Sequence, residues 1–318
     1  MGAIKVISTK PLEHSQLDAI ARVVPGVPVT GAANRDELLE MVRDAEAMYF
    51  VWNGVPLDAG ILAAGARLRW IHVGSTGVEK ALIPELVESD ITVTNARDVH
   101  AVPVTEHAFA QILTLAKCFH VYGRQQVGRV WQRGTGDILA GKVLGIIGFG
   151  SIGRELARRA RAFGMKVLAV GAAARAGRDG QVLGPEAMAQ VLAQSDYVAI
   201  CVPLTARTRG FFDRSNIFSI KKGSYLVNIA RGGIVDETAL VEALTTGHLA
   251  GAAFDVFAEE PLPADSPLWA LENLLITPHV AGAIPNHREV LAEHFAENLR
   301  RWIAGEPLLN VVDKRRGY

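Results

Sequence analysis

"VLGIIGFGSIGRELARRARAFG", residues 143–164, joins a short apolar run to an amphipathic helical pattern through three closely spaced glycines. Gly148, Gly150 and Gly153 form the pattern G-x-G-x-x-G. In this context the first glycine allows a tight turn, the second lets the backbone approach a pyrophosphate, and the third lets the helix pack closely on its strand. The segment therefore predicts a strand, a loop and a helix that together bind a dinucleotide.

The flanks of this segment indicate which dinucleotide would bind. At the start of the helix, the N–H groups of Ser151 and Ile152 would point to the phosphates. Sites for NAD place an acidic residue about 20 residues further on, at the end of the second strand. Here Gly171 takes that place, and Arg175 and Arg178 follow it. Because arginine pairs well with a 2′-phosphate, NADP is the expected cofactor. The alternative is NAD, with both arginines as solvated loop charges.

Apolar runs on both sides of the glycine loop alternate with helical patterns. After the loop begins, six nearly continuous apolar runs predict strands buried on both faces: KVLGII, MKVLAV, YVAICV, SYLVNI, GAAFDV and NLLITP. The first hundred residues alternate in the same way, with strands expected at IKVIS, AMYFVW, WIHVG and ITVTN. We predict an α/β fold of two Rossmann-like or flavodoxin-like domains, each built on a doubly wound parallel sheet.

The order of these segments predicts how the two domains are connected. A long helix is expected from Pro103 to Gly123, and a second long helix follows the last strand. The first helix would carry the chain out of one domain and the second would carry it back. We therefore predict a substrate-binding domain of residues 1–100 plus 285–318. A dinucleotide-binding domain, residues 101–284, would be inserted into it.

Composition limits the classes of partner. Lys plus Arg and Asp plus Glu each number 33, so no net charge attracts nucleic acid or an anionic membrane. No apolar run approaches the ~18 residues of a membrane-spanning helix. Cys118 and Cys201 lack paired spacing, which suits a reducing compartment and argues against a cysteine metal site. We expect a cytoplasmic protein that binds a small molecule and no metal.

Three polar residues each follow an apolar run that predicts a strand. Arg231 follows YLVNI, Glu260 follows AAFDV and His279 follows LLITP. Because ligands bind at the carboxyl ends of parallel strands, we expect the three side chains to share one site. Arg would hold a carboxylate, His would give a proton, and Glu would fix the tautomer of the imidazole. The set suits reduction of a 2-oxo acid, although each residue alone is also typical of a cap or turn.

The motifs together resemble the D-isomer-specific 2-hydroxyacid dehydrogenase family over essentially the whole chain. They are GIIGFGSIG, VPLTARTRG, LVNIARGGIVDETAL, GAAFDVFAEEPLP and LLITPHVAG. The resemblance implies hydride transfer between NAD(P)H and a small 2-oxo acid, as in glyoxylate or hydroxypyruvate reductases. It implies that Arg231 binds the substrate carboxylate and carbonyl, that Glu260 orients the histidine and that His279 is the acid/base.

The resemblance also implies further binding residues and a partner. Four residues match family positions along the cofactor: Pro203, Thr208, Ala230 and Asp255. Of these, Asp255 would hold the nicotinamide carboxamide and Ala230 would face the nicotinamide. Thr76 and Gly77 match a loop whose backbone amides hold the substrate carboxylate. The family pairs through the helix near Pro103–Gly123 and the loop behind it, which implies a homodimer.

Two alternative functions share these motifs. Phosphite-type dehydrogenases also use an Arg and a Glu–His pair, whereas formate dehydrogenases pair the histidine with glutamine, which disfavours them here because of Glu260. Some relatives are non-catalytic, NAD(H)-sensing corepressors that carry extra tails and partner-binding grooves, whereas we expect neither long tails nor charge runs in this sequence. Measurement of turnover separates the enzymes from the binding protein.

Overall fold

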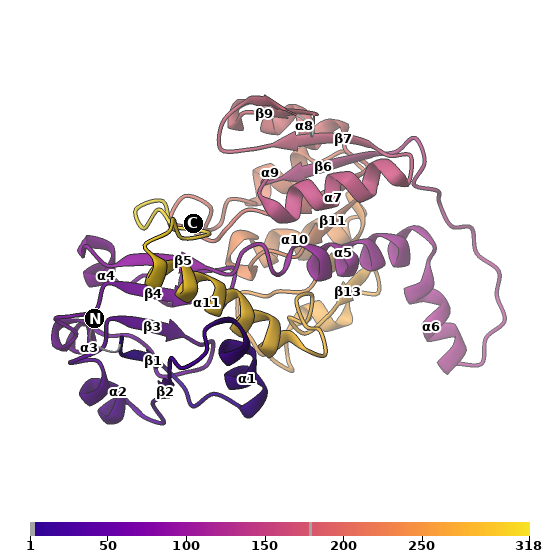
Figure 1. Cartoon of the computed structure of the whole chain (residues 1–318). Helices are drawn as coiled ribbons and strands as arrows, with labels where there is room; N and C mark the ends of the chain where they lie inside the picture. The colour runs from indigo at the N-terminus through magenta and orange to yellow at the C-terminus, as the bar shows by residue number, and fades with distance from the viewer. Residues whose placement is uncertain (1–3, 178–179) are drawn as a thin grey trace. The chain divides into compact units, whose positions relative to one another are not determined.

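The computed structural model describes residues 4–177 and 180–318, which form two compact units. The first unit contains the chain up to His100 together with Ile284–Tyr318, and the second contains Ala101–Ala283. Each has a mainly or wholly parallel sheet between helices (Figure 1). The second unit is inserted into the first, and the predicted fold class is confirmed. In the described part of the chain, no helix is long and apolar enough to cross a membrane.

The first unit is built on a five-stranded parallel sheet in the order β2-β1-β3-β4-β5, the flavodoxin-like order. Its strands are β1 (Val6–Ser8), β2 (Val29–Gly31), β3 (Ala47–Phe50), β4 (Trp70–Val73) and β5 (Thr92–Asn95). Its helices are α1 (His14–Val23), α2 (Arg35–Met41), α3 (Ala59–Ala64), α4 (Pro84–Glu88) and α11 (His287–Ala304). In Figure 1 the yellow α11 packs beside the indigo α1, so the two ends of the chain belong to one unit.

Alternate residues of these strands face opposite sides of the sheet. Val6 and Trp70 belong to the core beneath α1 and α11. Their chain neighbours Ile7 and Ile71 belong to the core beneath α2, α3 and α4. Burial of both faces explains why these strands read as continuous apolar runs. Strand β2 was not among the expected strands, because it is short and lies at the edge of the sheet.

The second unit has an eight-stranded sheet in the order β13-β12-β11-β10-β6-β7-β9-β8, in which only the β8–β9 pair is antiparallel. Its strands are β6 (Val143–Ile147), β7 (Lys166–Val170), β8 (Arg175–Gly177), β9 (Gly180–Leu183), β10 (Tyr197–Ile200), β11 (Ser224–Asn228), β12 (Leu249–Phe254) and β13 (Leu274–Ile276). Its α-helices are α5 (Ala101–Ala116), α6 (Phe119–Val127), α7 (Ser151–Ala162), α8 (Met188–Gln194), α9 (Arg214–Ser219) and α10 (Glu237–Thr245). Short 3-10 turns are η1 (Pro185–Ala187), η2 (Gly232–Ile234) and η3 (Pro267–Ala270).

This sheet is also buried on both faces. Ile146 and Val227 lie in the core beneath α5 and α7, whereas Ile147 and Leu226 lie in the core beneath α8, α9 and α10. The helices on both faces leave the carboxyl ends of the strands as the edge at which loops carry polar side chains. This is the edge where open α/β sheets bind ligands.

Two elements of the second unit differ from the sequence-based expectation. The helix expected from Pro103 to Gly123 is two helices, because Cys118 between α5 and α6 has a left-handed φ of 58°. The returning chain stabilises this break, since the Asp137 N–H donates to the carbonyl of Ala116, the last residue of α5. The segment after β7, expected to be a loop, contains two strands, β8 and β9, that pair antiparallel.

Candidate active site

The three predicted catalytic residues follow neighbouring strands of the second unit. β11, β12 and β13 are adjacent and parallel, so their carboxyl ends lie at one edge of the sheet. Arg231 follows β11, Glu260 follows β12 and His279 follows β13. The sheet order therefore places the three turns side by side, although they are widely spaced in the sequence.

His279 and Glu260 form a direct hydrogen bond. The distance between His279 Nδ1 and Glu260 Oε2 is 2.6 Å, and the other carboxylate oxygen, Oε1, accepts from the Phe257 N–H at 3.0 Å. Because an ionised carboxylate only accepts, Nδ1 carries the proton of this bond. The histidine and glutamate side chains are 37% and 35% exposed, so solvent or a ligand can reach the pair. This arrangement leaves Nε2 of His279 as the ring atom available to a substrate.

Asp255 holds the backbone on both sides of His279. It is 1% exposed, and its oxygens accept from the N–H groups of Val280 (3.0 Å) and Ala281 (2.9 Å). The N–H of His279 in turn donates to the Asp255 carbonyl at 2.8 Å. His279 has a positive φ of 53°, a conformation that most residues adopt only when the surroundings hold it. Asp255 thus stabilises the turn of the histidine, and its contact with a nicotinamide stays a prediction.

Three residues that the sequence analysis missed support Asp255. The Thr277 hydroxyl donates to Asp255 Oδ1 at 2.6 Å, and its oxygen accepts from Gln111 Nε2 at 3.1 Å. Nε2 of His107 lies 2.9 Å from the same oxygen and 3.2 Å from Gln111 Nε2, so the three side chains form one cluster at Asp255. The sequence feature that could have identified His107 and Gln111 as a pair was their spacing within α5, which places both on one helix face.

Asn228 stabilises the turn that carries Arg231. The buried Asn228 side chain accepts from the Ala230 N–H and donates to the Arg231 carbonyl, both at 3.1 Å. The half-buried guanidinium donates from Nη1 to the Ala230 carbonyl at 2.8 Å. These bonds orient the turn at the end of β11 and place a permanent positive charge there.

Gly232 brings the arginine turn against the segment that orients the acid/base pair. A Cβ at this position would overlap the backbone of Phe257 and Ala258, so only glycine fits. The Phe257 N–H is the group that donates to Glu260. Close packing at Gly232 therefore ties the turn of Arg231 to the pair of Glu260 and His279, and the structure brings the three predicted residues to one region.

The glycine loop has the geometry that the sequence predicts. Gly148 has a φ of 103°, and a Cβ there would lie 2.6 Å from the backbone carbonyl carbon of Cys201. A Cβ on Gly153 would overlap the carbonyl oxygen of Gly148, so the helix can approach the strand only with glycine here. A Cβ on Gly150 would meet no described atom within 4 Å, so this side of the loop is open. The loop leads directly into the first residue of α7, Ser151.

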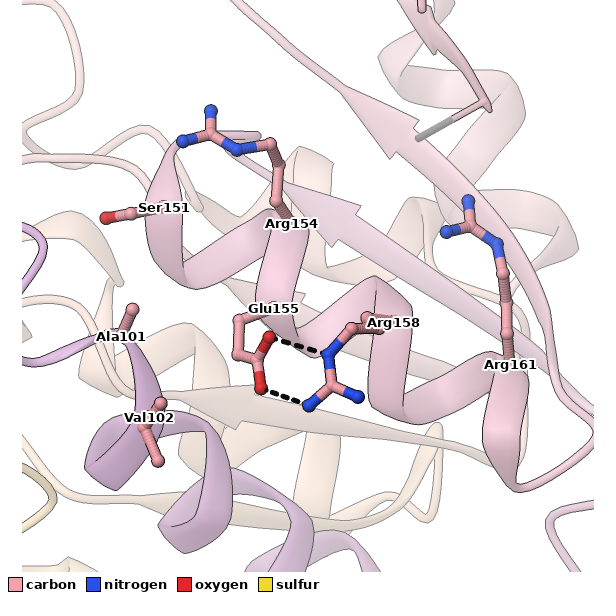
Figure 2. Close-up of a pocket in the computed structure, with 7 residues that line it drawn as sticks. All are labelled: Ala101, Val102, Ser151, Arg154, Glu155, Arg158 and Arg161. Carbon is pink, nitrogen blue, oxygen red and sulfur yellow. Dashed lines mark hydrogen bonds and ion pairs between the residues drawn. The ribbon is translucent and has the colours of Figure 1, made fainter. Parts of the chain in front are cut away.

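A cavity of about 320 Å³ lies along α7 (Figure 2). Its lining residues are Ala101, Val102, Ser151, Arg154, Glu155, Arg158 and Arg161. Arg158 donates to Glu155 through two nitrogens at 2.6 and 2.8 Å, and this bond lowers the pKa of the glutamate. Neither Arg231 nor His279 lines the cavity. Among these arginines, Arg154 lies in the N-terminal half of α7, where Ile152 also lies, and its positive charge favours an anion at the loop.

Arg175 lies on β8, and its side chain reaches the glycine loop. Its Nη2 donates to the carbonyl of Phe149, between the first two glycines of the motif, at 2.7 Å. Gly171 follows β7 at the position where sites for NAD carry an acidic residue. Arg178, the other arginine named from the sequence, lies outside the described residues.

Pro203, Thr208 and Ala230 lie on loops at the same edge of the sheet. The Thr208 hydroxyl donates to the Pro203 carbonyl at 2.6 Å and accepts from the Thr205 N–H at 2.8 Å, which closes the loop after β10. Strand β10 is the neighbour of β6, which precedes the glycine loop. Ala230 is buried directly before Arg231. The predicted contacts of Pro203, Thr208 and Ala230 with a cofactor stay predictions.

Thr76 and Gly77 belong to a loop of the first unit whose carbonyls accept hydrogen bonds from its own unit. Each carbonyl of this loop accepts one hydrogen bond. The Ser75 carbonyl accepts from the Ala96 N–H at 3.1 Å, and the Thr76 carbonyl accepts from Asn95 Nδ2 at 2.7 Å. The Gly77 carbonyl accepts from the Ser75 hydroxyl at 2.7 Å. The N–H groups of Thr76 and Gly77 donate to no group within residues 4–177 and 180–318. Successive amides that donate to no described group, beside carbonyls that are already paired, are features of an anion-binding loop.

Comparisons with known proteins agree on one family. The family model described as "D-isomer specific 2-hydroxyacid dehydrogenase, NAD binding domain" matches residues 109–281. The glyoxylate reductase of Pyrococcus furiosus is 36% identical over 88% of this chain and 86% of that protein. The D-3-phosphoglycerate dehydrogenase of Methanocaldococcus jannaschii is 32% identical over 98% of this chain, which spans 59% of the length of that relative. A solved D-isomer specific 2-hydroxyacid dehydrogenase from Xanthobacter autotrophicus Py2, in complex with NADPH and MES, has a TM-score of 0.87 and 29% identity, with 100% of both chains covered.

Proposed function

The chain belongs to the D-isomer-specific 2-hydroxyacid dehydrogenase family, and from this premise we propose that it reduces a small 2-oxo acid to the D-2-hydroxy acid. Glyoxylate and hydroxypyruvate are the proposed substrates, because the relative from Pyrococcus furiosus is a glyoxylate reductase and a solved neighbour from Sinorhizobium meliloti, 26% identical, is an NADPH-dependent glyoxylate/hydroxypyruvate reductase. The observation that carries the proposal is the 2.6 Å bond between His279 and Glu260, with the turn of Arg231 packed against the same segment.

The residues of the second unit fit a nicotinamide dinucleotide. The open side of Gly150 and the close contacts at Gly148 and Gly153 form a cradle for a pyrophosphate at the N-terminus of α7. When bound, the dinucleotide supplies or accepts the hydride. We propose a preference for NADP because the guanidinium of Arg175 lies on this loop and Gly171 replaces the carboxylate that would repel a 2′-phosphate. NADPH in the solved relative from Xanthobacter autotrophicus supports this preference.

The three strand-end residues have distinct proposed roles in the reaction. Arg231 binds the substrate carboxylate and polarises the carbonyl, because its planar fork matches a carboxylate and keeps its charge. In the reductive direction, His279 donates the proton on Nε2 to the developing alkoxide oxygen and keeps the proton on Nδ1. Glu260 accepts the Nδ1 proton and prevents rotation of the ring. In the oxidative direction Nε2 takes the proton from the hydroxyl of the substrate.

A turnover assay tests this proposal. The purified protein is mixed with NADPH or NADH and with glyoxylate, hydroxypyruvate or pyruvate, and loss of the reduced cofactor is followed by absorbance. Phosphite with NADP⁺ is a separate arm that detects the phosphite-type activity. We expect turnover with a 2-oxo acid that falls by at least about 100-fold in His279→Ala, the range for loss of a general acid. The exposed His14→Ala is the matched control.

Two outcomes of this assay would contradict the proposal. Turnover of His279→Ala at the wild-type rate would exclude the residue as proton donor. Absence of turnover with every 2-oxo acid, together with tight binding of the reduced cofactor, would favour a binding protein. Turnover with phosphite alone would assign the chain to the other reaction.

We also propose a homodimer formed through α6 and the segment that follows it. None of the residues of α6 is buried, and this part extends away from the rest of the second unit (Figure 1). Val127 and Trp131 are 87% and 94% exposed, and Phe119, Val130 and Ile138 are also exposed. Apolar side chains gathered in this way are typical of interfaces. Light scattering should report a dimer that dissociates more readily in Trp131→Ser; a wild-type monomer would refute the proposal.

A further inference from the structure

A chain of hydrogen bonds runs from the predicted anion-binding loop to the start of α11, all within the first unit. The Thr76 hydroxyl lies 2.9 Å from Nδ1 of His100. Nε2 of His100 lies 2.8 Å from Nε2 of His287, the first residue of α11. His100 is 9% exposed, and burial lowers the pKa of His287, which favours a neutral ring. The two imidazoles therefore face each other through a single hydrogen bond.

Only two proton arrangements satisfy this chain, because one proton fits between two facing nitrogens. In the first, His100 donates from Nε2 to His287, and its Nδ1 accepts the proton of the Thr76 hydroxyl. In the second, His287 donates from Nε2 to His100, whose own proton then lies on Nδ1 and is donated to the oxygen of Thr76. The arrangement of the histidine pair decides which way the threonine hydroxyl proton points.

The two arrangements differ in what the loop offers to an anion. In the first, the hydroxyl proton of Thr76 is used, and its oxygen presents only lone pairs. In the second, the hydroxyl proton is available, next to the amide N–H groups of Thr76 and Gly77 that donate to no group in the described residues. A carboxylate accepts hydrogen bonds and is repelled by lone pairs, so it selects the second arrangement.

We propose that His100 and His287 are positioning residues that make the Thr76 hydroxyl a third donor of this loop, beside the amides of Thr76 and Gly77, to the carboxylate of the substrate. This inference rests on the proposed function, because the anion is taken to be the 2-oxo acid. Neither histidine touches the substrate: His287 donates to His100, and His100 donates to Thr76. The bond to a charged acceptor forms with the bound acid in the ground state and the transition state alike, so its loss should raise KM and leave kcat nearly unchanged.

Four variants test the chain. Thr76→Val removes the hydroxyl and keeps the shape of the side chain, and we expect KM to rise about 10- to 100-fold. His287→Phe removes the donor to His100 and should raise KM in the same direction. Because both changes act on one hydroxyl, the double variant should have the KM of Thr76→Val alone. His287→Gln keeps an N–H donor for His100, so its KM should stay within about 2-fold of wild type.

Two results would overturn the inference: an unchanged KM in His287→Phe while Thr76→Val is impaired, or equal impairment in His287→Gln and His287→Phe. Thermal unfolding of each variant shows that it is folded. A second measurement does not depend on turnover. In protein with ¹⁵N-labelled histidine, oxamate, an anion that is not reduced, should shift His100 to the Nδ1–H tautomer. A wild-type protein without turnover refutes the proposed function, whereas an unchanged tautomer under saturating oxamate refutes this inference.

Discussion

Replacement of Gly232 by alanine tests the packing that joins Arg231 to the acid/base pair. A Cβ at this position would lie 1.8 Å from the carbonyl carbon of Phe257, whereas ordinary contact begins near 3.4 Å. One of the two turns must therefore move by about 1.6 Å, the difference between these distances. Both contacting atoms are backbone, so no side-chain rotation can relieve the overlap. Overpacking of this kind costs about 1–3 kcal/mol of the free energy of unfolding.

The effect on catalysis should exceed the effect on stability. Misplacement of a reacting group by about 1 Å can lower the rate by about 100-fold. We therefore expect kcat/KM for the preferred 2-oxo acid to fall by about 100-fold or more in Gly232→Ala. The loss of stability should lower the Tm by about 2–12 °C, at about 2–4 °C per kcal/mol for a domain of this size. Steady-state kinetics and thermal unfolding by circular dichroism measure both quantities.

The neighbouring glycine is the matched control. A Cβ on Gly233 would meet Arg209 at 3.4 Å and Leu204 at 3.7 Å, which are ordinary contacts. Gly233→Ala should therefore keep kcat/KM within about 3-fold of wild type, since its contacts need no rearrangement. If Gly232→Ala keeps wild-type kinetics and Tm, or if both alanine variants are equally impaired, close packing at Gly232 does not position the site.

Two further predictions concern the cofactor and pH. Arg175→Ala should weaken binding of NADPH about 10- to 30-fold, because one guanidinium near a phosphate charge of about −1.5 to −2 contributes about 1.5–2 kcal/mol in water. Binding of NADH should stay within about 2-fold, and equal losses in fluorescence titrations would show that the residue does not select the phosphate. Burial lowers the pKa of His72, His287 and His294, so the unfolded chain binds their protons more readily below about pH 6.5. The contribution of these neutral rings to the free energy of unfolding is complete above that pH. Urea unfolding at pH 7, 6 and 5 should show that the free energy of unfolding falls by up to about 1.4 kcal/mol per pH unit for each histidine. A constant free energy of unfolding over this range would contradict the burial of neutral rings.

Much of the fold and site could be predicted from local patterns. The glycine loop needs particular residues within one strand–turn–helix, so dinucleotide binding can be predicted from a short segment. Buried strands need apolar side chains on both faces, which makes them visible as runs. The polar residues at the ends of those runs, Arg231, Glu260 and His279, follow from the rule that parallel strands end at a common edge. Each of these features depends on neighbours in the sequence or on a general property of sheets.

Local patterns are thus sufficient to predict two α/β units, a dinucleotide loop and three residues at strand ends. The packing of the folded chain brings His100 to His287, 187 positions later, and lets Thr277 join α5 to Asp255. It also decided that α5 ends at Ala116, where the returning chain occupies a carbonyl of the helix. These contacts cannot be predicted from local patterns, because a hydrogen bond between distant segments requires both segments to pack on the same core. The periodicity of either segment does not depend on which residue it will contact.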